Sequence, residues 1–439
     1  MDGQHAHLGY ADAKELETLA ARVGVLESSS VGHASDANAH DGATPSGDSD
    51  AGPGDVGYGQ RERPRSLPPF AADEAARFSR VHDLGGQTIR LGERYVQGGE
   101  LWRNGEVVST YEFPSLFRCY GIENFGFADL TISVPDAQWY NRDAVIDLRS
   151  GAREMLLHNV RLLGAPEHGV ELGAASLVRG CDISADWVAL AGGESGSLVQ
   201  DSVFRQAKPL RAPERLPDGS YRYFDRAHHG AAKIAPAYDN VFERTDFLAV
   251  GGDGFAVGGV LWEDTGSGGN RYTDCLAGAV HAEIADNQGR GGPMYLDWCT
   301  LRGGAFPGYP VGLRQQGVLL MHLAPVVMTH GLIEVDLSRE NGIILWDNDG
   351  RANAPSRSDS AAGPSLSSAG SLIAETLVRV RASDPASVPG RTVHLDHPER
   401  VELERVVFRL DASVPTEERG RLEALVAGRG NGCRVEIAG

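Results

Sequence analysis

LVRGCDISADWVALAGGESGSLVQDSVFR, residues 177–205, contains one eight-residue pattern twice, 21 residues apart. Residues 177–184 read LVRGCDIS and residues 198–205 read LVQDSVFR, so each copy has an apolar doublet, a polar turn and a later apolar residue. A chain that returns to one apolar pattern at a fixed minimum interval is typical of a solenoid, in which each turn stacks on the previous one. The stretch therefore predicts stacked turns rather than a sheet built from helical crossovers.

The same unit recurs along the chain when the copies are aligned on the polar turn residue, which we call the anchor. An apolar residue stands three places after each anchor, as in Gly180 with Ile183 and Asp201 with Phe204. The shortest spacing, 21 residues, gives the structural period, and longer spacings of up to 45 residues predict inserted loops. The anchors are Asp129, Asn159, Gly180, Asp201, Arg244, Asp274, Trp298, His330, Glu375 and Arg405.

A short apolar strand precedes most of these units. It reads AVIDL from residue 144, GVELG from 169, WVALAG from 187, GFAVGG from 254, GVLLMHL from 317, GIILW from 342 and TVHLD from 392. No helical periodicity separates the strands, so each is expected to pair with its copy one turn later. Cys181, Cys275 and Cys299 each follow an anchor by one residue, which predicts an interior stack of small apolar side chains rather than reactive thiols.

This repeat resembles the right-handed parallel β-helix, or pectate-lyase-like, superfamily over roughly residues 83–411. The resemblance implies an all-β fold, a right-handed parallel β-helix solenoid of about ten rungs within a domain at residues 67–411. Short N- and C-terminal capping helices are expected over residues 73–81 and 414–428, because the open edges of a solenoid need cover. The second of these helices, with a following strand, forms a segment at residues 412–439.

The N-terminal part of the chain predicts a tether. Residues 1–27 place apolar side chains at gaps of 3, 4 and 3, the spacing of a coiled-coil seam, at Leu16, Leu19, Val23 and Leu26. This indicates a short coiled-coil-like helix for oligomerisation or docking, with an amphipathic helix packed on its own domain as the alternative. Residues 28–66 are mostly small, polar or turn-forming, which predicts a flexible linker or extended arm.

Composition restricts the partners. The chain carries 60 acidic and 41 basic residues and a net charge of −19, which argues against nucleic acid. Its acidic, arginine-rich and lysine-poor composition resembles that of proteins from extreme halophiles, with a GC-rich genome as the alternative. We expect no membrane span, no signal peptide and no cofactor, and the five scattered cysteines predict neither a zinc site nor a disulfide framework.

The long insertions hold the candidate functional residues. If the protein is an enzyme, the insertion between Asp201 and Arg244 offers the catalytic candidates Asp225, His228, His229 and Lys233. Aromatic rings can stack on sugars and cations can meet carboxylates, so the ligand-binding candidates are Trp139, Tyr140, Tyr221, Tyr223 and Arg226. A surface loop or a subunit contact is the alternative. Asp347 and Asp349 are weak metal candidates, with too few oxygen ligands for calcium.

The order of parts is similar to that of viral tail spikes, tail fibres and capsid spikes. It predicts a virion structural protein (spike, fibre or decoration protein) that projects a rigid β-helix for host attachment, of a virus of halophilic archaea. The expected partners are copies of itself, other virion proteins at the N-terminal segment, and a host-surface glycan or glycoprotein. The expected location is the virion surface, or otherwise the cell surface or exterior. The alternative is a polysaccharide lyase or glycoside hydrolase, which we disfavour because the resembling family's calcium-binding aspartates and its NTD, DD, GHG and RIK motifs are absent.

Overall fold

The fold is described from a computed structural model. The structure describes Phe78 and residues 80–90, 99–103, 106–111, 117–119, 121–134, 144–148, 151–165, 168–186, 188–192, 194–207, 214–215, 221–222, 230–234, 237–250, 256–258, 260–263, 267–283, 293–303, 317–322, 325–345, 370–396, 398–429 and 431–438. The predicted helix at residues 1–27, with Leu16, Leu19, Val23 and Leu26, and the arm at residues 28–66 lie outside the described residues.

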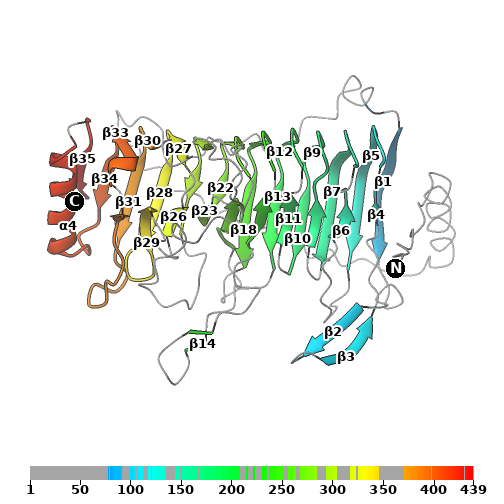
Figure 1. The fold of residues 1–439 in the computed structure, drawn as a ribbon, viewed down its shortest axis with the longest axis horizontal. Helices are drawn as coiled ribbons and strands as arrows, with labels where there is room; N and C mark the ends of the chain where they lie inside the picture. The colour runs from blue at the N-terminus through cyan, green and yellow to red at the C-terminus, as the bar shows by residue number, and fades with distance from the viewer. Residues whose placement is uncertain are drawn as a thin grey trace, which may run out of the picture. The chain divides into compact units, whose positions relative to one another are not determined.

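Parallel strands in large sheets make up most of the described chain (Figure 1). Three long strands begin the stack, because β1 (Arg80–Arg90) pairs with β5 (Phe125–Ser133) and β5 pairs with β7 (Leu156–Ala165). Beyond β7, each turn contributes separate strands that pair with their copies on the neighbouring turns. The arrangement is consistent with a β-solenoid.

Two series of strands continue the 21-stranded sheet, one on each side of the anchors. The first series, which precedes the anchors, is β9 (Leu177–Arg179), β12 (Leu198–Gln200), β17 (Val241–Glu243), β21 (Arg271–Thr273), β24 (Met294–Asp297), β27 (Val326–Thr329), β30 (Ser371–Ala374) and β33 (Val401–Glu404). The second series, which follows the anchors, is β10 (Asp182–Ala185), β13 (Val203–Gln206), β18 (Asp246–Val250), β22 (Leu276–Ala277), β25 (Thr300–Leu301), β28 (Leu332–Asp336), β31 (Leu377–Arg381), β34 (Val407–Leu410) and β35 (Arg434–Ile437).

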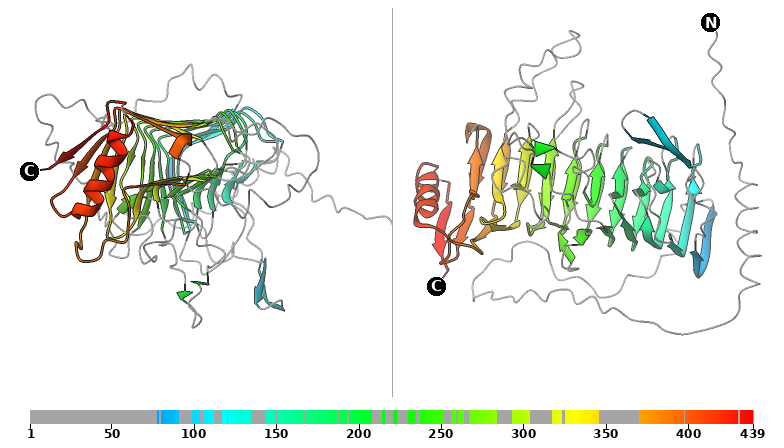
Figure 2. Two further views of the ribbon diagram at one scale, coloured as in Figure 1. Left: turned by 60° about the vertical axis from the view of Figure 1, so that its left-hand side comes forward. Right: turned by 90° about the horizontal axis from the view of Figure 1, so that it is seen from below.

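A separate ten-stranded parallel sheet forms the third series (Figure 2). It contains β4 (Phe117–Arg118), β6 (Ala144–Asp147), β8 (His168–Glu171), β11 (Val188–Gly192), β16 (Ala232–Ile234), β20 (Val260–Glu263), β23 (Ala279–Glu283), β26 (Gly317–His322), β29 (Asn341–Leu345) and β32 (Val393–Leu395). Two antiparallel hairpins form separate two-stranded sheets, β2 (Gly99–Arg103) with β3 (Glu106–Tyr111), and β14 (Glu214–Arg215) with β15 (Tyr221–Arg222).

The anchors are the bends between the first and second series, and all ten have positive φ, between 47° and 64°. Glycine, asparagine and aspartate adopt this left-handed conformation most readily, which explains the residue type at the five anchors Asp129, Asn159, Gly180, Asp201 and Asp274. The apolar residue three places after each anchor points inward and is at most 2% exposed, from Ile132 to Phe408. The predicted repeat is therefore confirmed at every anchor, and Gly432, with φ of 71°, makes the same bend before β35.

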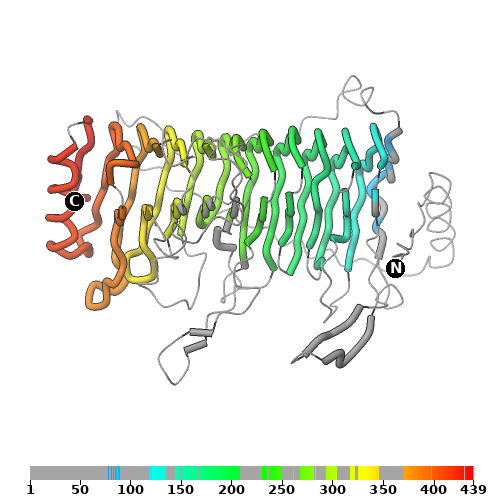
Figure 3. The backbone as a smooth tube through the Cα atoms, in the orientation of Figure 1, coloured from blue at the N-terminus to red at the C-terminus, as the bar shows by residue number. Residues whose placement is uncertain are grey.

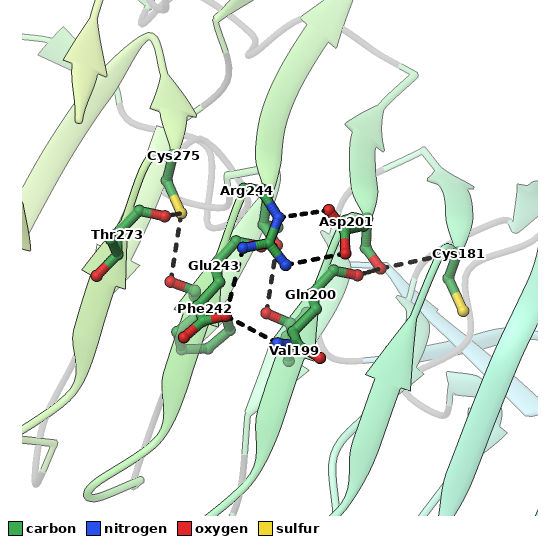
Figure 4. Close-up of polar contacts among 11 residues, drawn as sticks. Cys181, Val199, Gln200, Asp201, Phe242, Glu243, Arg244, Thr273 and Cys275 are labelled. Carbon is green, nitrogen blue, oxygen red and sulfur yellow. Dashed lines mark hydrogen bonds and ion pairs between the residues drawn. The ribbon is translucent and has the colours of Figure 1, made fainter. Parts of the chain in front are cut away.

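The residue after each anchor is buried, as predicted for Cys181, Cys275 and Cys299, which are at most 2% exposed. The structure adds a shared hydrogen bond, because these side chains donate to the carbonyl oxygen two residues earlier. Cys275 Sγ lies 3.4 Å from the Thr273 oxygen, and on the preceding turn Thr245 Oγ1 lies 3.1 Å from the Glu243 oxygen. Figure 4 shows this contact of Cys275 and, beside it, the ion pair of Arg244 with Asp201. Arg244 Nε donates to Asp201 Oδ1 at 2.6 Å, and Arg244 Nη2 donates to Asp201 Oδ2 at 3.0 Å.

Two local predictions were wrong. The helix expected over residues 73–81 does not continue to Val81, because Arg80 and Val81 belong to β1 and pair with Phe125 and Gly126 of β5. Strand pairing overrides the weak helical pattern there. The strand expected from residue 254 is also misplaced, since β19 (Ala256–Gly258) pairs antiparallel with β18, and β20 occupies the expected place in the ten-stranded sheet.

The C-terminal helix lies within the predicted residues. Helix α4 (Thr416–Ala427) follows β34 and buries Leu422, while Leu425 and Val426 pack partly against the core. The Glu418 carboxylate, 5% exposed, accepts the Thr392 N–H at 2.8 Å. A 3-10 turn, η3 (Pro398–Arg400), precedes β33. The backbone trace in Figure 3 shows α4 and β35 beside the last turns of the stack.

Candidate functional site: an arginine-lined groove

The sequence-predicted site residues are mostly outside the described chain. Lys233 lies in β16 of the ten-stranded sheet, half-buried, in register with Ala191 and Trp262. Tyr221 lies in the separate hairpin of β14 and β15. The structure therefore does not place these two residues in one sheet. Trp139, Tyr140, Tyr223, Asp225, Arg226, His228, His229, Asp347 and Asp349 lie outside the described residues.

A different set of charged residues gathers on the outer surface of the second series. In β28 and β31 alternate residues face inward, and Val335 and Val380 are at most 3% exposed. The residues between them face outward, since successive strand side chains point to opposite faces. Parallel register then places Glu334 beside Arg379 and Asp336 beside Arg381.

These residues line a groove of about 430 Å³. Its charged lining residues are Arg302, Glu334, Asp336, Arg339, Glu340, Arg379, Arg381, Arg409 and Asp411. In a chain with 60 acidic and only 41 basic residues, a lining of five arginines and four carboxylates is more basic than the chain average. The groove is therefore the strongest candidate for binding an anion among the described residues.

Two carboxylates hold four of the arginines. Glu334 lies 3.4 Å from Arg302 Nε and 3.4 Å from Arg379 Nη1. Asp336 Oδ2 lies 3.5 Å from Arg381 Nε and 3.9 Å from Arg339 Nε. A guanidinium has five N–H donors, and each of these contacts uses one nitrogen. The two carboxylates thus position four guanidiniums, and the groove as a whole is lined by five arginines and four carboxylates.

Asp336 is the fixed anion at the base of this arrangement. Its residue is only 5% exposed, and Oδ1 accepts the backbone N–H groups of Ser383 at 3.0 Å and Ser338 at 3.2 Å. Burial raises the pKa of Asp336, but the hydrogen bonds from Ser383 and Ser338 and the charge of Arg381 together bring that pKa below its ordinary value. Asp336 is therefore ionised at neutral pH and remains a counter-ion for the arginines.

At the Arg409 side of the groove the ionisable side chains are also held in their charged forms. Arg409 Nε and Nη2 each donate to Glu436 Oε2 at 3.2 Å. Hydrogen bonds from Arg434 and then Arg409 lower the pKa of Glu436, and hydrogen bonds from Ser413 lower the pKa of Asp411. A general acid needs a carboxyl group that still carries its proton near neutral pH. These lowered pKa values favour ion binding over proton transfer.

The repeat contained a signal for this groove that the sequence analysis missed. Arg302, Glu334, Arg379 and Arg409 each stand four places after an anchor. They therefore form one outward row on neighbouring turns, which alignment on the anchors would have shown. The residues predicted from the sequence come instead from the long insertions, where polar residues are dense.

Fold and groove together define the class as a β-solenoid-like protein with an arginine-lined binding surface. No protein-family model, curated protein sequence or solved structure matches this chain. Within the described parts of the chain, no group of three or more His, Cys, Asp or Glu side chains could hold a metal ion. No helix there is long and apolar enough to cross a membrane.

Proposed function

We propose that the chain forms a right-handed parallel β-helix of about ten rungs, with a short helix capping its C-terminal end. Connections between parallel strands of one sheet are right-handed in about 98% of cases, which supports the handedness. Ten anchors with one backbone conformation support the number of rungs. The contact of α4 with β35 supports its role as the C-terminal cap.

We propose that this β-helix is a non-enzymatic attachment protein that binds an acidic glycan of a host surface through the arginine groove. Four guanidiniums held by two shared carboxylates carry the proposal. Guanidinium forks match the paired oxygens of carboxylates and sulfate esters, and their remaining N–H donors are available for such groups. A ligand with several oxyanions would gain contacts from more than one arginine.

The proposed setting is the surface of a virion that infects halophilic archaea, where the protein serves as a spike, fibre or decoration protein. The order of helix, arm and β-helix supports this placement, and residues 1–27 would provide oligomerisation and docking to other virion proteins. The net charge of −19 repels an acidic glycan at long range. Salt screens that repulsion beyond roughly 8 Å at physiological ionic strength, which leaves the short contacts in the groove to decide binding.

Replacing Arg379 and Arg381 together by glutamine is expected to weaken binding to an acidic polysaccharide about 100-fold, because two charge-assisted contacts are lost. Calorimetry with the full chain would compare polygalacturonate, which carries carboxylates, with dextran sulfate and neutral dextran. The matched control is Arg153→Gln with Arg161→Gln, which removes the same charge from exposed positions on the earlier turns around β7.

Equal loss in the control variant would show that only net charge matters, and unchanged binding in the groove variant would refute the groove. If the wild type binds neither polygalacturonate nor dextran sulfate, an acidic glycan is refuted as the ligand. In the same incubations we expect no new reducing ends and no unsaturated sugars. Release of either product would replace the attachment proposal by a polysaccharide lyase or hydrolase, and Asp225→Ala with His228→Ala would then test the insertion.

A further inference from the structure

One anchor carries a side chain that fits its backbone poorly. Trp298 has φ of 55°, in the left-handed region where bulky residues are uncommon. A residue held there costs free energy, and such residues cluster at functional sites where the surroundings fix them. Asparagine or glycine would make the same bend at lower cost, as Asn159 and Gly180 do on earlier turns. The indole therefore needs a reason other than the bend.

The next turn places an imidazole against the indole. The rings of Trp298 and His330 are stacked, with centroids 4.7 Å apart and planes 5° apart. His330 is held at both nitrogens, by Asp297 Oδ1 at 2.9 Å from Nδ1 and by Glu375 Oε2 at 2.7 Å from Nε2. The side chains of His330, Asp297 and Glu375 are 33%, 43% and 38% exposed, so a ligand can reach all three.

A second half-buried aromatic residue lies on the same strand as Asp297. Tyr295 and Asp297 both face outward from β24, because the residues on either side, Met294 and Leu296, are buried. The Arg271 guanidinium lies 4.3 Å from the centre of the Tyr295 ring. Aromatic rings and carboxylates therefore share one outward surface, which we call the Trp298 patch: Tyr295, Asp297, Trp298, His330 and Glu375.

We propose that the Trp298 patch binds an uncharged sugar ring. The apolar face of a pyranose would pack on the aromatic rings, and its hydroxyl groups would donate to the Asp297 and Glu375 carboxylates. Arg405 Nη2 donates to Glu375 Oε1 at 2.6 Å, so Asp297 is the carboxylate that disfavours an acidic sugar here and separates this patch from the arginine groove by ligand charge. The patch extends the proposed function by a second subsite, but its evidence does not depend on the groove.

The two sites share the same turns of chain. Trp298, His330 and Glu375 are anchors, and the groove residues Arg302, Glu334 and Arg379 stand four places after them. Four residues of extended strand span at most roughly 13 Å, so a glycan lying along the strands could place a neutral residue on the patch and an acidic residue in the groove. The patch would then select which acidic glycans bind.

The test replaces Trp298 by asparagine. Binding of the full chain would be measured on an array of neutral gluco-, galacto-, manno- and N-acetylglucosamine hexasaccharides, with melting temperature recorded for each variant. We expect at least one array member to bind the wild type, Trp298→Asn to lose at least 10-fold in affinity, and Trp298→Phe to lose less than about threefold. The melting temperature of Trp298→Asn should not fall, because asparagine relieves the backbone strain. Asp129→Asn, at an equivalent anchor, is the matched control and should bind like the wild type.

The outcomes separate the two sites. Arg379→Gln with Arg381→Gln should keep neutral binding, and Trp298→Asn should keep most of the binding to polygalacturonate or dextran sulfate. Absence of any neutral hexasaccharide bound by the wild type would overturn the proposal. Unchanged binding with a lowered melting temperature in Trp298→Asn would also overturn it, since the Trp298–His330 stack would then serve stability alone.

Discussion

Replacing Phe242 by alanine is expected to lower the free energy of unfolding by about 3–5 kcal/mol, because a fully buried ring is removed from a stack that cannot close around the cavity. Phe242 is 0% exposed and its ring lies parallel to that of Tyr272, with centroids 4.6 Å apart. Phe247 also packs against it edge-on, at 6.1 Å. Chemical denaturation followed by circular dichroism would measure the loss.

The matched control is Val241→Ala, one residue earlier in β17, whose side chain faces outward and is half-buried. Its cost should be well below that of the Phe242 change, since part of the side chain is already in water. If the two variants unfold at the same denaturant concentration, the inward series of aromatic rings is not the core of this part of the fold. Solenoid turns contact mainly their neighbours, so hydrogen exchange should rise first in β12, β17 and β21.

The repeat could be predicted from the sequence because two physical demands recur on every turn. The inward side chain three places after the anchor must be apolar, as at Phe204 and Phe247, and the anchor itself must accept a left-handed bend. The sign of φ was not predicted, because half of the anchors are not glycine, asparagine or aspartate. Those are Arg244, Trp298, His330, Glu375 and Arg405.

The candidate sites could not be predicted in the same way. Outward positions are free to hold any polar residue, so the apolar repeat does not require arginine at Arg302 or Arg379. Alignment on the anchors places these residues in one row, but it does not mark that row as a binding surface. Their importance comes from register between turns, which pairs residues 45 apart such as Glu334 and Arg379. Trp298 was recognised as a repeat position, and only its large ring in the left-handed conformation shared by all the anchors and its stacking on His330 distinguish it.

The pH dependence of stability should also reflect the buried thiols. Burial raises the pKa of Cys119 and Cys181 from 9.0 to about 12, and nearby carboxylates, Asp147 and Asp182, add to the effect. The unfolded chain therefore loses these protons at lower pH than the folded chain does. Their contribution to stability is complete below pH 9 and is lost as the pH rises towards 12, so the denaturation midpoint should fall over that interval.

Alkylation of Cys181 by iodoacetamide at pH 8 is expected to be about 10³-fold slower than that of a free small-molecule thiol. The thiolate is the nucleophile, and a pKa of about 12 in place of 9.0 reduces the thiolate fraction of Cys181 by that factor. Single-cysteine variants would retain either Cys181 or the half-buried Cys433, with serine at the other cysteine positions. Serine suits these bends, since Ser202 occupies the equivalent place on the next turn and donates to the Gln200 oxygen at 2.7 Å. Intact-protein mass spectrometry would follow the reaction, and Cys433 should be modified first. Rapid modification of Cys181 in a variant that retains its melting temperature would mean that the inward row of residues after the anchors is open to solvent. The thiols would then be candidates for chemistry rather than packing.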